Sequence, residues 1–189
     1  MKTLYYSTGP TPFGDFTIGL DATGALAAAA FGGEPALQTR APDLALVLAP
    51  DRTAAAWTQF AAYFENAAAA FQLALAPTGS AFQQRVWAAL RRIPCGQTRS
   101  YGQLADELGS SARAVGRANA TNPICVAIPC HRVIGADGSL TGYAFGEDLK
   151  RRLLEHEGVR LAGIADPTSG VAPGPARRRS RQPVGVEAR

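Results

Sequence analysis

A cysteine and a histidine stand side by side in the sequence as Cys130 and His131, between Pro129 and Arg132. A thiol is mostly protonated at neutral pH, so it becomes a nucleophile only where a base or a cation lies close. His131 is the obvious base. Neighbouring side chains of an extended segment point apart, so we expect a water molecule to bridge the two groups. Pro129 stiffens the chain before the thiol, which suits a fixed nucleophile.

A carboxylate is predicted to complete this group. A helix beginning at Asp148 places Leu153 and Glu157 on one face, and Gly158 can terminate it. Glu157 therefore continues an apolar stripe, and a buried carboxylate needs a partner. One interpretation pairs it with His131, which would give a Cys–His–Glu chain of the kind that activates nucleophiles. The alternative is an ordinary helix-end carboxylate that pairs with an arginine.

The remaining cysteines and histidines do not form a metal site. The chain has three cysteines, Cys95, Cys125 and Cys130, no CxxC pair, and only two histidines, His131 and His156. An odd cysteine count in 189 residues favours reduced thiols in a cytoplasmic protein over a disulfide scaffold. We read Cys95 and Cys125 as small buried residues. There is no apolar run long enough to span a membrane, and the first ten residues lack the apolar core of a signal peptide.

The charge is unevenly distributed along the chain. Residues 1–79 carry a net charge of −3, residues 80–164 carry +4 and residues 165–189 carry +3, which gives the formal total of +4. A basic half is typical of proteins that bind a polyanion. An arginine-rich composition explains the same excess, and charge alone does not decide between the two.

The chain divides into four segments that differ in composition and residue pattern. Period-two alternation predicts a strand at 16–20, and the turn at 21–24 makes 25–31 the returning strand. Helical spacing predicts a helix over 54–66. We therefore expect a small α/β domain, with an antiparallel sheet, over 1–75. Residues 76–79 (Ala-Pro-Thr-Gly) form the predicted linker, 80–164 a second domain, and 165–189 a disordered basic tail rich in Arg, Pro and Gly.

The second domain is predicted to be mainly helical. Capping boxes start helices at Ser80 and Ser100, and Ser110 can cap the next helix, which runs to about Asn119. Two short helices joined at Gly109 make a helix-turn-helix pattern, which on its own is a weak sign of DNA binding. The second of them alternates small residues with arginines: Ser111, Ala112, Arg113, Ala114, Gly116 and Arg117. Small residues permit close approach to a partner or tight packing on a neighbouring helix, and both interpretations stay open.

The segment Pro129-Cys130-His131-Arg132-Val133 resembles the active-site signature of the O6-alkylguanine-DNA alkyltransferases, also called methylated-DNA–protein-cysteine methyltransferases. Further motifs fall in the family's order and spacing: 82–87, 93–94, 98–102, 113–116, 122–123, 142–143 and 153–158. The resemblance is strong over roughly 78–160 and faint over 1–75. It implies an RNase H-like first domain and a winged-helix-like second one.

The resemblance implies direct-reversal repair of double-stranded DNA, bound through the minor groove by a monomer. The damaged guanine is flipped into the protein, and its O6-alkyl group is transferred once and irreversibly to Cys130, with O4-alkylthymine as a further possible substrate. His131 would act as the water-mediated base, Glu157 would orient it, and Asn122 would brace the turn around the thiol. No cofactor is implied, since the lesion itself is the alkyl donor.

The DNA contacts are implied in the same way. Arg113 would fill the gap left by the flipped nucleotide, and Tyr101 would crowd the target phosphate and hydrogen-bond guanine N3. Arg117 is a phosphate contact by charge and position. The helix face formed by Ser111, Ala112, Ala114 and Gly116 would approach the DNA backbone. Main-chain groups of Cys130, Val133 and Ala144 would recognise the flipped guanine through hydrogen bonds.

The sequence departs from the family pattern in one turn. Family members often have Gly-Gly after the turn tyrosine, whereas Tyr143-Ala144-Phe145 places an aromatic residue at the expected pocket rim. If Phe145 points inward, it should disfavour bulky O6 groups. The basic tail, 165–189, lies beyond the family core. One interpretation is that it adds nonspecific, salt-sensitive affinity for DNA, and the alternative, which we favour, is that it is dispensable.

Two rival functions can be stated. A module that recognises alkylated bases without repairing them would lack the nucleophile, and Cys130 argues against it. A Cys–His hydrolase would leave the helix-turn-helix and Arg113 unexplained. We expect a cytoplasmic, nucleoid-associated protein of bacterial origin that makes no contact with membranes.

Overall fold

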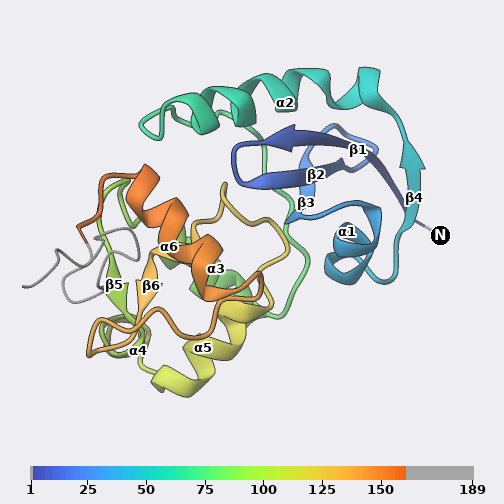
Figure 1. Ribbon diagram of the computed structural model, residues 1–189. Helices are drawn as coiled ribbons and strands as arrows, with labels where there is room; N and C mark the ends of the chain where they lie inside the picture. The colour runs from blue at the N-terminus through green and yellow to red at the C-terminus, as the bar shows by residue number, and fades with distance from the viewer. Residues whose placement is uncertain (1, 161–189) are drawn as a thin grey trace, which may run out of the picture.

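The computed structural model describes residues 2–160 (Figure 1), and the structural statements below refer to this range. The predicted disordered tail, 165–189, and the predicted end of the second domain at 164 lie outside the described residues. Between residues 2 and 160, no helix is both long enough and apolar enough to cross a membrane.

The first part of the chain forms a four-stranded sheet in the order β3-β2-β1-β4. Its strands are β1 (Thr3–Thr11), β2 (Gly14–Leu20), β3 (Leu26–Phe31) and β4 (Ala45–Leu48). The first three strands pair antiparallel, as predicted, but β4 runs parallel to β1, so the expectation of an antiparallel sheet was wrong. The reason is helix α1 (Glu34–Arg40), which carries the chain from β3 to the opposite edge, so that β4 runs in the direction of β1.

Alternation along the strands gives the sheet two apolar faces. Phe16 and Ile18 of β2 lie in the cluster that includes Phe60 of α2 (Pro50–Glu65), whereas Leu4 of β1 lies in a smaller cluster with Leu37 of α1. Figure 1 shows α2 above the strands and α1 below them. The sheet is therefore covered by one helix on each side.

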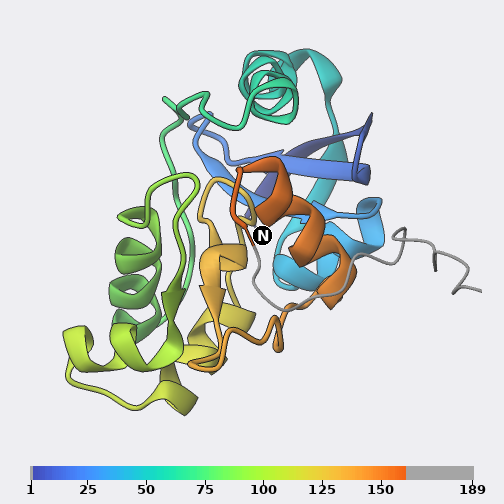
Figure 2. The ribbon, with the colours of Figure 1, turned by 60° about the vertical axis from the view of Figure 1, so that its left-hand side comes forward.

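The second part of the chain is mainly helical. Its helices are α3 (Ala81–Arg91), α4 (Tyr101–Leu108), α5 (Ala112–Ala120) and α6 (Glu147–His156), with a 3-10 turn η1 (Cys130–Arg132). Two short parallel strands, β5 (Arg99–Ser100) and β6 (Val133–Ile134), lie between them. In Figure 2 helices α3, α4 and α5 are grouped on one side and the sheet with α2 on the other, and in both views α6 lies between them.

The local signals at the helix ends are confirmed with one exception. Ser80 and Ser100 each form a complete capping box with the glutamine three residues later. Gly109 ends α4 in the left-handed conformation, with φ of 59°. The cap of α5 is Ser111, not the predicted Ser110, since the Ser111 side chain accepts the Ala114 N–H. Each cap satisfies backbone groups that would otherwise lack partners at a helix end.

The two parts share one apolar core. A single cluster of buried side chains runs from Phe16 and Phe60 in the first part to Trp87, Leu104 and Leu153 in the second. The edge of β3 also joins the two parts, because Ala29 N–H donates to Pro123 O and Cys125 N–H donates to Ala29 O. The second part is therefore attached along the open edge of the sheet.

Candidate active site

Cys130 lies at the start of η1, directly after a buried apolar segment. Cys130 is 5% exposed and His131 is fully buried. The two residues belong to a 3-10 turn, and not to the extended segment that the sequence analysis assumed. The side chains nevertheless make no direct hydrogen bond within residues 2–160, because His131 Nε2 bonds to Glu157 and Nδ1 has no partner there.

His131 and Glu157 form a buried pair, as the sequence analysis proposed. His131 Nε2 lies 2.8 Å from Glu157 Oε1, and both side chains are fully shielded from solvent. The carboxylate accepts, so Nε2 carries the proton and Nδ1 presents its lone pair. Burial lowers the pKa of His131, and the charge of Glu157 offsets only part of this effect. The imidazole is therefore neutral near pH 7, with a free basic nitrogen.

Glu157 also pairs with an arginine, so the two alternatives left open by the sequence are both present. Arg132 Nε donates to Oε2 and Arg132 Nη2 donates to Oε1, each at 2.8 Å. Arg132 Nη1 donates to Ile93 O at 2.6 Å. Burial alone would raise the pKa of Glu157, but the hydrogen bonds from His131 and Arg132 outweigh it and hold that pKa well below its usual range. Arg132 neutralises the carboxylate, which lets His131 stay uncharged.

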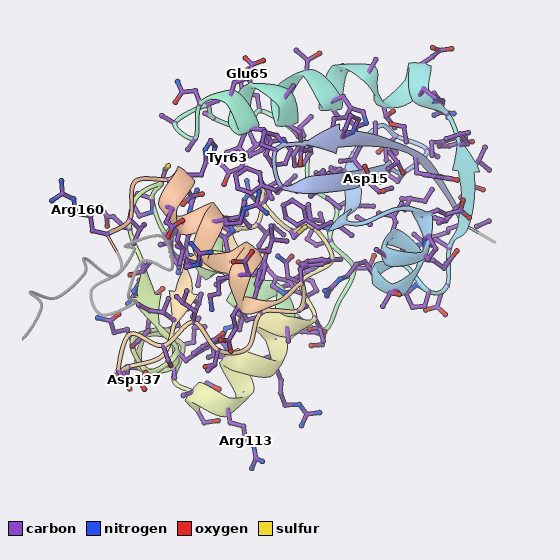
Figure 3. The ribbon with its side chains drawn as sticks, in the orientation of Figure 1. Asp15, Tyr63, Glu65, Arg113, Asp137 and Arg160 are labelled. Carbon is purple, nitrogen blue, oxygen red and sulfur yellow. The ribbon has the colours of Figure 1, made fainter. Side chains whose placement is uncertain are left out.

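A third residue that bonds to Glu157 comes from the first part of the chain, and nothing in the sequence predicted it. Tyr63, on α2, donates its hydroxyl to Glu157 Oε1 at 2.8 Å and is 1% exposed. Figure 3 shows the labelled Tyr63 side chain between α2 and the end of α6. In the sequence it is one more apolar position of an amphipathic helix, and nothing there indicates its polar partner.

The loop before the thiol is held by Asn122, which is 2% exposed. Asn122 Oδ1 accepts the Ile124 N–H at 3.0 Å, and Nδ2 donates to Ile128 O at 2.8 Å. The loop also contains Val126 with φ of 71°, a left-handed conformation that a β-branched residue rarely adopts. Such a conformation persists only where the surroundings enforce it. The loop that leads to Cys130 is thus rigidly constrained.

Two contacts from the first part of the chain hold the same loop. Ala29 of β3 pairs with it, since Cys125 N–H donates to Ala29 O at 3.1 Å. Arg40, at the end of α1, donates to Ala120 O at 2.8 Å and to Asn122 O at 3.4 Å. The Ala120 carbonyl lies at the C-terminal end of α5, where a cation interacts favourably with the helix dipole.

A small cavity lies beside Cys130. It is lined by Arg40, Asn119, Ala120, Asn122, Cys130 and the turn Gly142–Phe145, and its volume is about 10 Å³. That is room for about one water molecule and far too small for a guanine. Phe145 forms part of the rim, with its ring 5.7 Å from the Phe31 ring and the Arg40 guanidinium 4.9 Å from its centre.

Two polar side chains meet at the other side of this turn. Lys150 Nζ donates to Thr141 O at 3.2 Å, and the Tyr101 hydroxyl donates to the same oxygen at 3.4 Å. Lys150 is fully buried, which lowers its pKa to about 8. Burial also raises the pKa of the Cys130 thiol, although Asn122, Arg40 and Lys150 act in the opposite sense. The thiol therefore stays protonated until a base takes its proton.

The face of α5 is exposed where the sequence places its arginines. Ser111, Ala112, Arg113 and Arg117 are exposed, and Figure 3 shows Arg113 pointing away from the body of the protein. A groove of about 390 Å³ runs along this face, lined by Phe82, Gln83, Ser111, Arg113, Ala114, Arg117, Ala118 and Thr121. Gly116 faces the Tyr101 ring instead. Gly116 therefore packs on a neighbouring helix, whereas close approach of Ser111 and Ala112 to a partner stays a prediction.

The other cysteines differ from each other. Cys125 is buried, as expected, but Cys95 is exposed, so the expectation that it is a buried residue was wrong. It lies in the turn after Pro94, with its thiol 3.2 Å from Ala67 O. Within residues 2–160, no group of three or more His, Cys, Asp or Glu side chains is placed to hold a metal ion.

The fold and the site together define a class: a helical DNA-binding domain that carries a buried Cys–His–Glu group. Residues 81–159 match the family model described as the 6-O-methylguanine DNA methyltransferase DNA-binding domain. A methylated-DNA–protein-cysteine methyltransferase of Methanosarcina acetivorans is 53% identical over 102 residues, which cover 53% of this chain and 65% of that protein. The chain thus matches just under two thirds of that relative's length.

Solved structures extend the match over both parts of the chain. A crystal structure of Mycobacterium tuberculosis O6-methylguanine methyltransferase is 41% identical, with a TM-score of 0.68, and covers 83% of this chain and 93% of its own. A structure of Mycobacterium tuberculosis OGT in complex with DNA is 42% identical, with a TM-score of 0.70, over 82% and 93%. The chain belongs to the O6-methylguanine-DNA methyltransferase family.

Proposed function

We propose that this protein repairs DNA directly, by moving the alkyl group of an O6-alkylguanine in duplex DNA to its own Cys130. The observation that carries the proposal is the buried His131, directly after Cys130 in the same 3-10 turn, whose Nε2 is held by Glu157 and whose Nδ1 has no hydrogen-bond partner within residues 2–160. Relatives at 41–53% identity are named as methyltransferases of this kind. Transfer of a methyl group to a cysteine makes the protein a methylated-DNA–protein-cysteine S-methyltransferase.

In the proposed reaction, the proton of the Cys130 thiol passes through a water molecule to His131 Nδ1, and Glu157 stabilises the imidazolium. The thiolate sulfur attacks the alkyl carbon, a C–S bond forms, and the bond between that carbon and guanine O6 breaks. The guanine leaves with the bonding electron pair, and a hydrogen bond donated by Tyr101 to N3 stabilises its negative charge until the proton held by His131 returns to it through water. No cofactor takes part, and the thioether has no route back. Each molecule therefore acts once.

The exposed face of α5 supports binding to the minor groove of DNA. The small side chains of Ser111, Ala112 and Ala114 allow close approach, and Arg117 is placed to contact a phosphate. Arg113 projects freely from the helix and would fill the space left by a flipped nucleotide. Extruding a base costs a few kcal/mol, and less for a lesion that pairs badly, which favours damaged sites.

The base-reading groups lie around the cavity beside Cys130. Tyr143, Ala144 and Phe145 form its rim, and the Ala144 N–H would donate to guanine O6. The Val133 carbonyl, at the start of β6, and the Cys130 carbonyl would accept from the exocyclic amine. Asn119 Nδ2 and the Val133 N–H both donate to the Cys130 carbonyl, so these bonds would loosen when a base enters.

The proposal also covers the fold of each domain, the oligomeric state, the range of substrates and association with the nucleoid. The strand order β3-β2-β1-β4 supports an RNase H-like first domain over 1–75, and the β5–β6 pair beside α4 and α5 supports a winged-helix-like second domain over 80–164. The chain would act as a monomer on O6-alkylguanine, and possible O4-alkylthymine activity belongs to the same test. A chromosomal DNA substrate implies association with the nucleoid.

The test is intact mass spectrometry after mixing with excess duplex DNA that carries O6-methylguanine. We expect a gain of one methyl group per chain, absent in Cys130→Ala and retained in Cys95→Ala, which removes an exposed thiol instead. Binding without a gain in mass would overturn the proposal in favour of a recognition module. Continuous turnover of an ester or a peptide would overturn it in favour of a hydrolase.

A further inference from the structure

We propose that Tyr63 is a positioning residue for the transfer, which holds Glu157 against His131 and moderates how strongly Glu157 attracts a proton to His131. The inference rests on the proposed function, because it assigns a role within that reaction. It also means that the first part of the chain influences the transfer reaction through Tyr63, although that part carries no reactive motif.

The geometry places the Tyr63 hydroxyl in direct competition with His131. Glu157 Oε1 accepts three hydrogen bonds of 2.8 Å, from Tyr63 Oη, His131 Nε2 and Arg132 Nη2. Each donor draws on the same negative charge, so every added donor weakens the attraction between the carboxylate and the others. The Tyr63 hydroxyl therefore reduces the charge that Glu157 presents to His131.

Tyr63 is also held in place by a second contact with α6. Its main-chain carbonyl accepts a hydrogen bond from His156 Nε2 at 2.8 Å, and the two rings lie 5.4 Å apart. The residue directly before Glu157 and Glu157 itself are thus both bound by Tyr63. This double attachment fixes the end of α6, and with it the carboxylate, relative to η1.

A second tyrosine provides a matched comparison within the same part of the chain. The Tyr6 hydroxyl donates to the Glu34 carboxylate, and Tyr6 is 9% exposed. The chemical groups are the same, but Glu34 makes no contact with His131 or Cys130. Glu34 is exposed, so loss of the Tyr6 hydroxyl is a control for removing a tyrosine–carboxylate hydrogen bond outside the site.

The charged and titratable groups that face this cluster come from several elements. They are His131 and Arg132 from η1, Lys150 and His156 from α6, Cys95 from the turn after α3, and Tyr143 from the turn before α6. Arg132 and Lys150 oppose protonation of His131, and Glu157 favours it. Removing the Tyr63 hydroxyl leaves the two cations unchanged and strengthens the effect of Glu157. The pKa of His131 should then rise.

The experiment measures the single-turnover rate of methyl transfer against pH for wild type, Tyr63→Phe and Tyr6→Phe. Rates are taken per competent molecule, counted from the final extent of transfer, so that a misfolded fraction does not enter. In Tyr63→Phe we expect the acid limb of the profile to move up by roughly 0.5–1 pH unit. That corresponds to a rate about three- to tenfold lower on the acid limb, with the rate near pH 8 within about twofold of wild type.

Tyr6→Phe should leave the profile where it is. The Tyr63→Phe change should also leave the profile unmoved when Glu157 is already replaced by Gln, because no carboxylate charge remains to be moderated. An NMR titration of the His131 ring in the Cys130→Ala background should show the same upward shift in Tyr63→Phe. An unmoved acid limb, or an equal loss of rate at every pH, would overturn the inference. Failure of the proposed function is a different result, in which wild type gains no methyl group.

Discussion

The two parts of the molecule contribute to the site in opposite ways. Residues 81–159 hold every group proposed to touch DNA or the alkyl group, including Cys130 and Arg113. Residues 2–75 hold none of these, yet they contact the site through β3, Arg40 and Tyr63. The first part therefore acts as a frame that fixes reactive groups carried by the second.

The difference also explains the uneven charge. The +4 of residues 80–164 includes the exposed Arg113 and Arg117, which are proposed to face DNA, whereas no charged residue of 1–79, with its net charge of −3, is proposed to do so. Two polar side chains of the first part instead make hydrogen bonds within the protein. Tyr63 donates to the buried Glu157 carboxylate, and Arg40 donates to the Ala120 carbonyl. A buried hydrogen bond fixes geometry, and an exposed cation is available to a partner.

The largest effect is expected where the two parts meet, at Glu157. Replacing Glu157 by Ala leaves Arg132 and His131 buried without their acceptor, so the free energy of unfolding should fall by about 3–5 kcal/mol. Denaturant unfolding followed by the fluorescence of Trp57 and Trp87 measures the loss. The control is Glu107→Ala, which removes an exposed carboxylate between Arg92 and Arg99 and should cost about 1 kcal/mol or less. Equal losses of unfolding free energy in Glu157→Ala and Glu107→Ala would contradict the prediction that the buried contacts of Glu157 contribute most to stability.

Arg40 joins α1 to the end of α5, and its loss should have the next largest effect. Arg40→Met removes two charge-assisted hydrogen bonds to main-chain oxygens and should lower the free energy of unfolding by about 2 kcal/mol. The same unfolding experiment measures it. Arg52→Met is the matched control, since Arg52 is exposed over the Tyr5 ring and should matter by about 1 kcal/mol or less. If Arg40→Met lowered the free energy of unfolding by less than Arg52→Met, the contacts of Arg40 with the end of α5 would not hold the two parts together as inferred.

A substitution at Phe145 tests whether packing against the first part of the chain also limits the size of the O6-alkyl group that can react. Its ring packs on Phe31 and beneath Arg40, which narrows the cavity beside Cys130. Phe145→Gly should raise the transfer rate for O6-benzylguanine relative to O6-methylguanine by about tenfold, or 1.4 kcal/mol. Competition between the two lesions in otherwise identical duplexes measures the ratio. Rates that are comparable for both lesions in wild type and unchanged in Phe145→Gly would remove the basis of this prediction.

The buried imidazole predicts how stability depends on pH. The pKa of His131 is lower in the folded protein than in the unfolded chain, where it is about 6.5, so the unfolded chain binds the proton first. The free energy of unfolding should therefore fall by about 1 kcal/mol between pH 7.5 and pH 5.5. Glu157 acts only at lower pH, because its pKa is depressed and its contribution is lost under strongly acidic conditions. In His131→Gln the slope between pH 7.5 and pH 5.5 should flatten, and an unchanged slope would assign it to another group.

The smallest effect on the protein itself is expected at the exposed face of α5. Arg117→Ala should change the free energy of unfolding by no more than about 0.5 kcal/mol, since the side chain is exposed. It should weaken DNA binding and reduce the slope of log affinity against log salt by about 1. Fluorescence anisotropy at several salt concentrations measures both. Arg91→Ala removes an exposed arginine that does not line the α5 groove, and it should leave the slope unchanged.

Much of the molecule is encoded locally and could be predicted from the sequence. The capping boxes at Ser80 and Ser100, the stop at Gly109 and the apolar stripe that ends at Glu157 are patterns within a few residues. The same holds for strand β2, whose apolar residues Phe16, Ile18 and Leu20 alternate in the sequence. Short-range patterns determine local conformation through backbone hydrogen bonds and side-chain periodicity, and these need no knowledge of the rest of the chain.

Other features were decided by the tertiary structure alone. Tyr63 lies 94 positions from Glu157 in the sequence and Arg40 lies 80 positions from Ala120, so no local pattern links them. The parallel pairing of β4 depends on where α1 returns the chain, and the pairing of Ala29 with Cys125 depends on the free edge of β3. The sequence by itself determined which residues could react. Only folding decided which residues hold them, because a buried polar group accepts whichever partner the packing brings within hydrogen-bond distance.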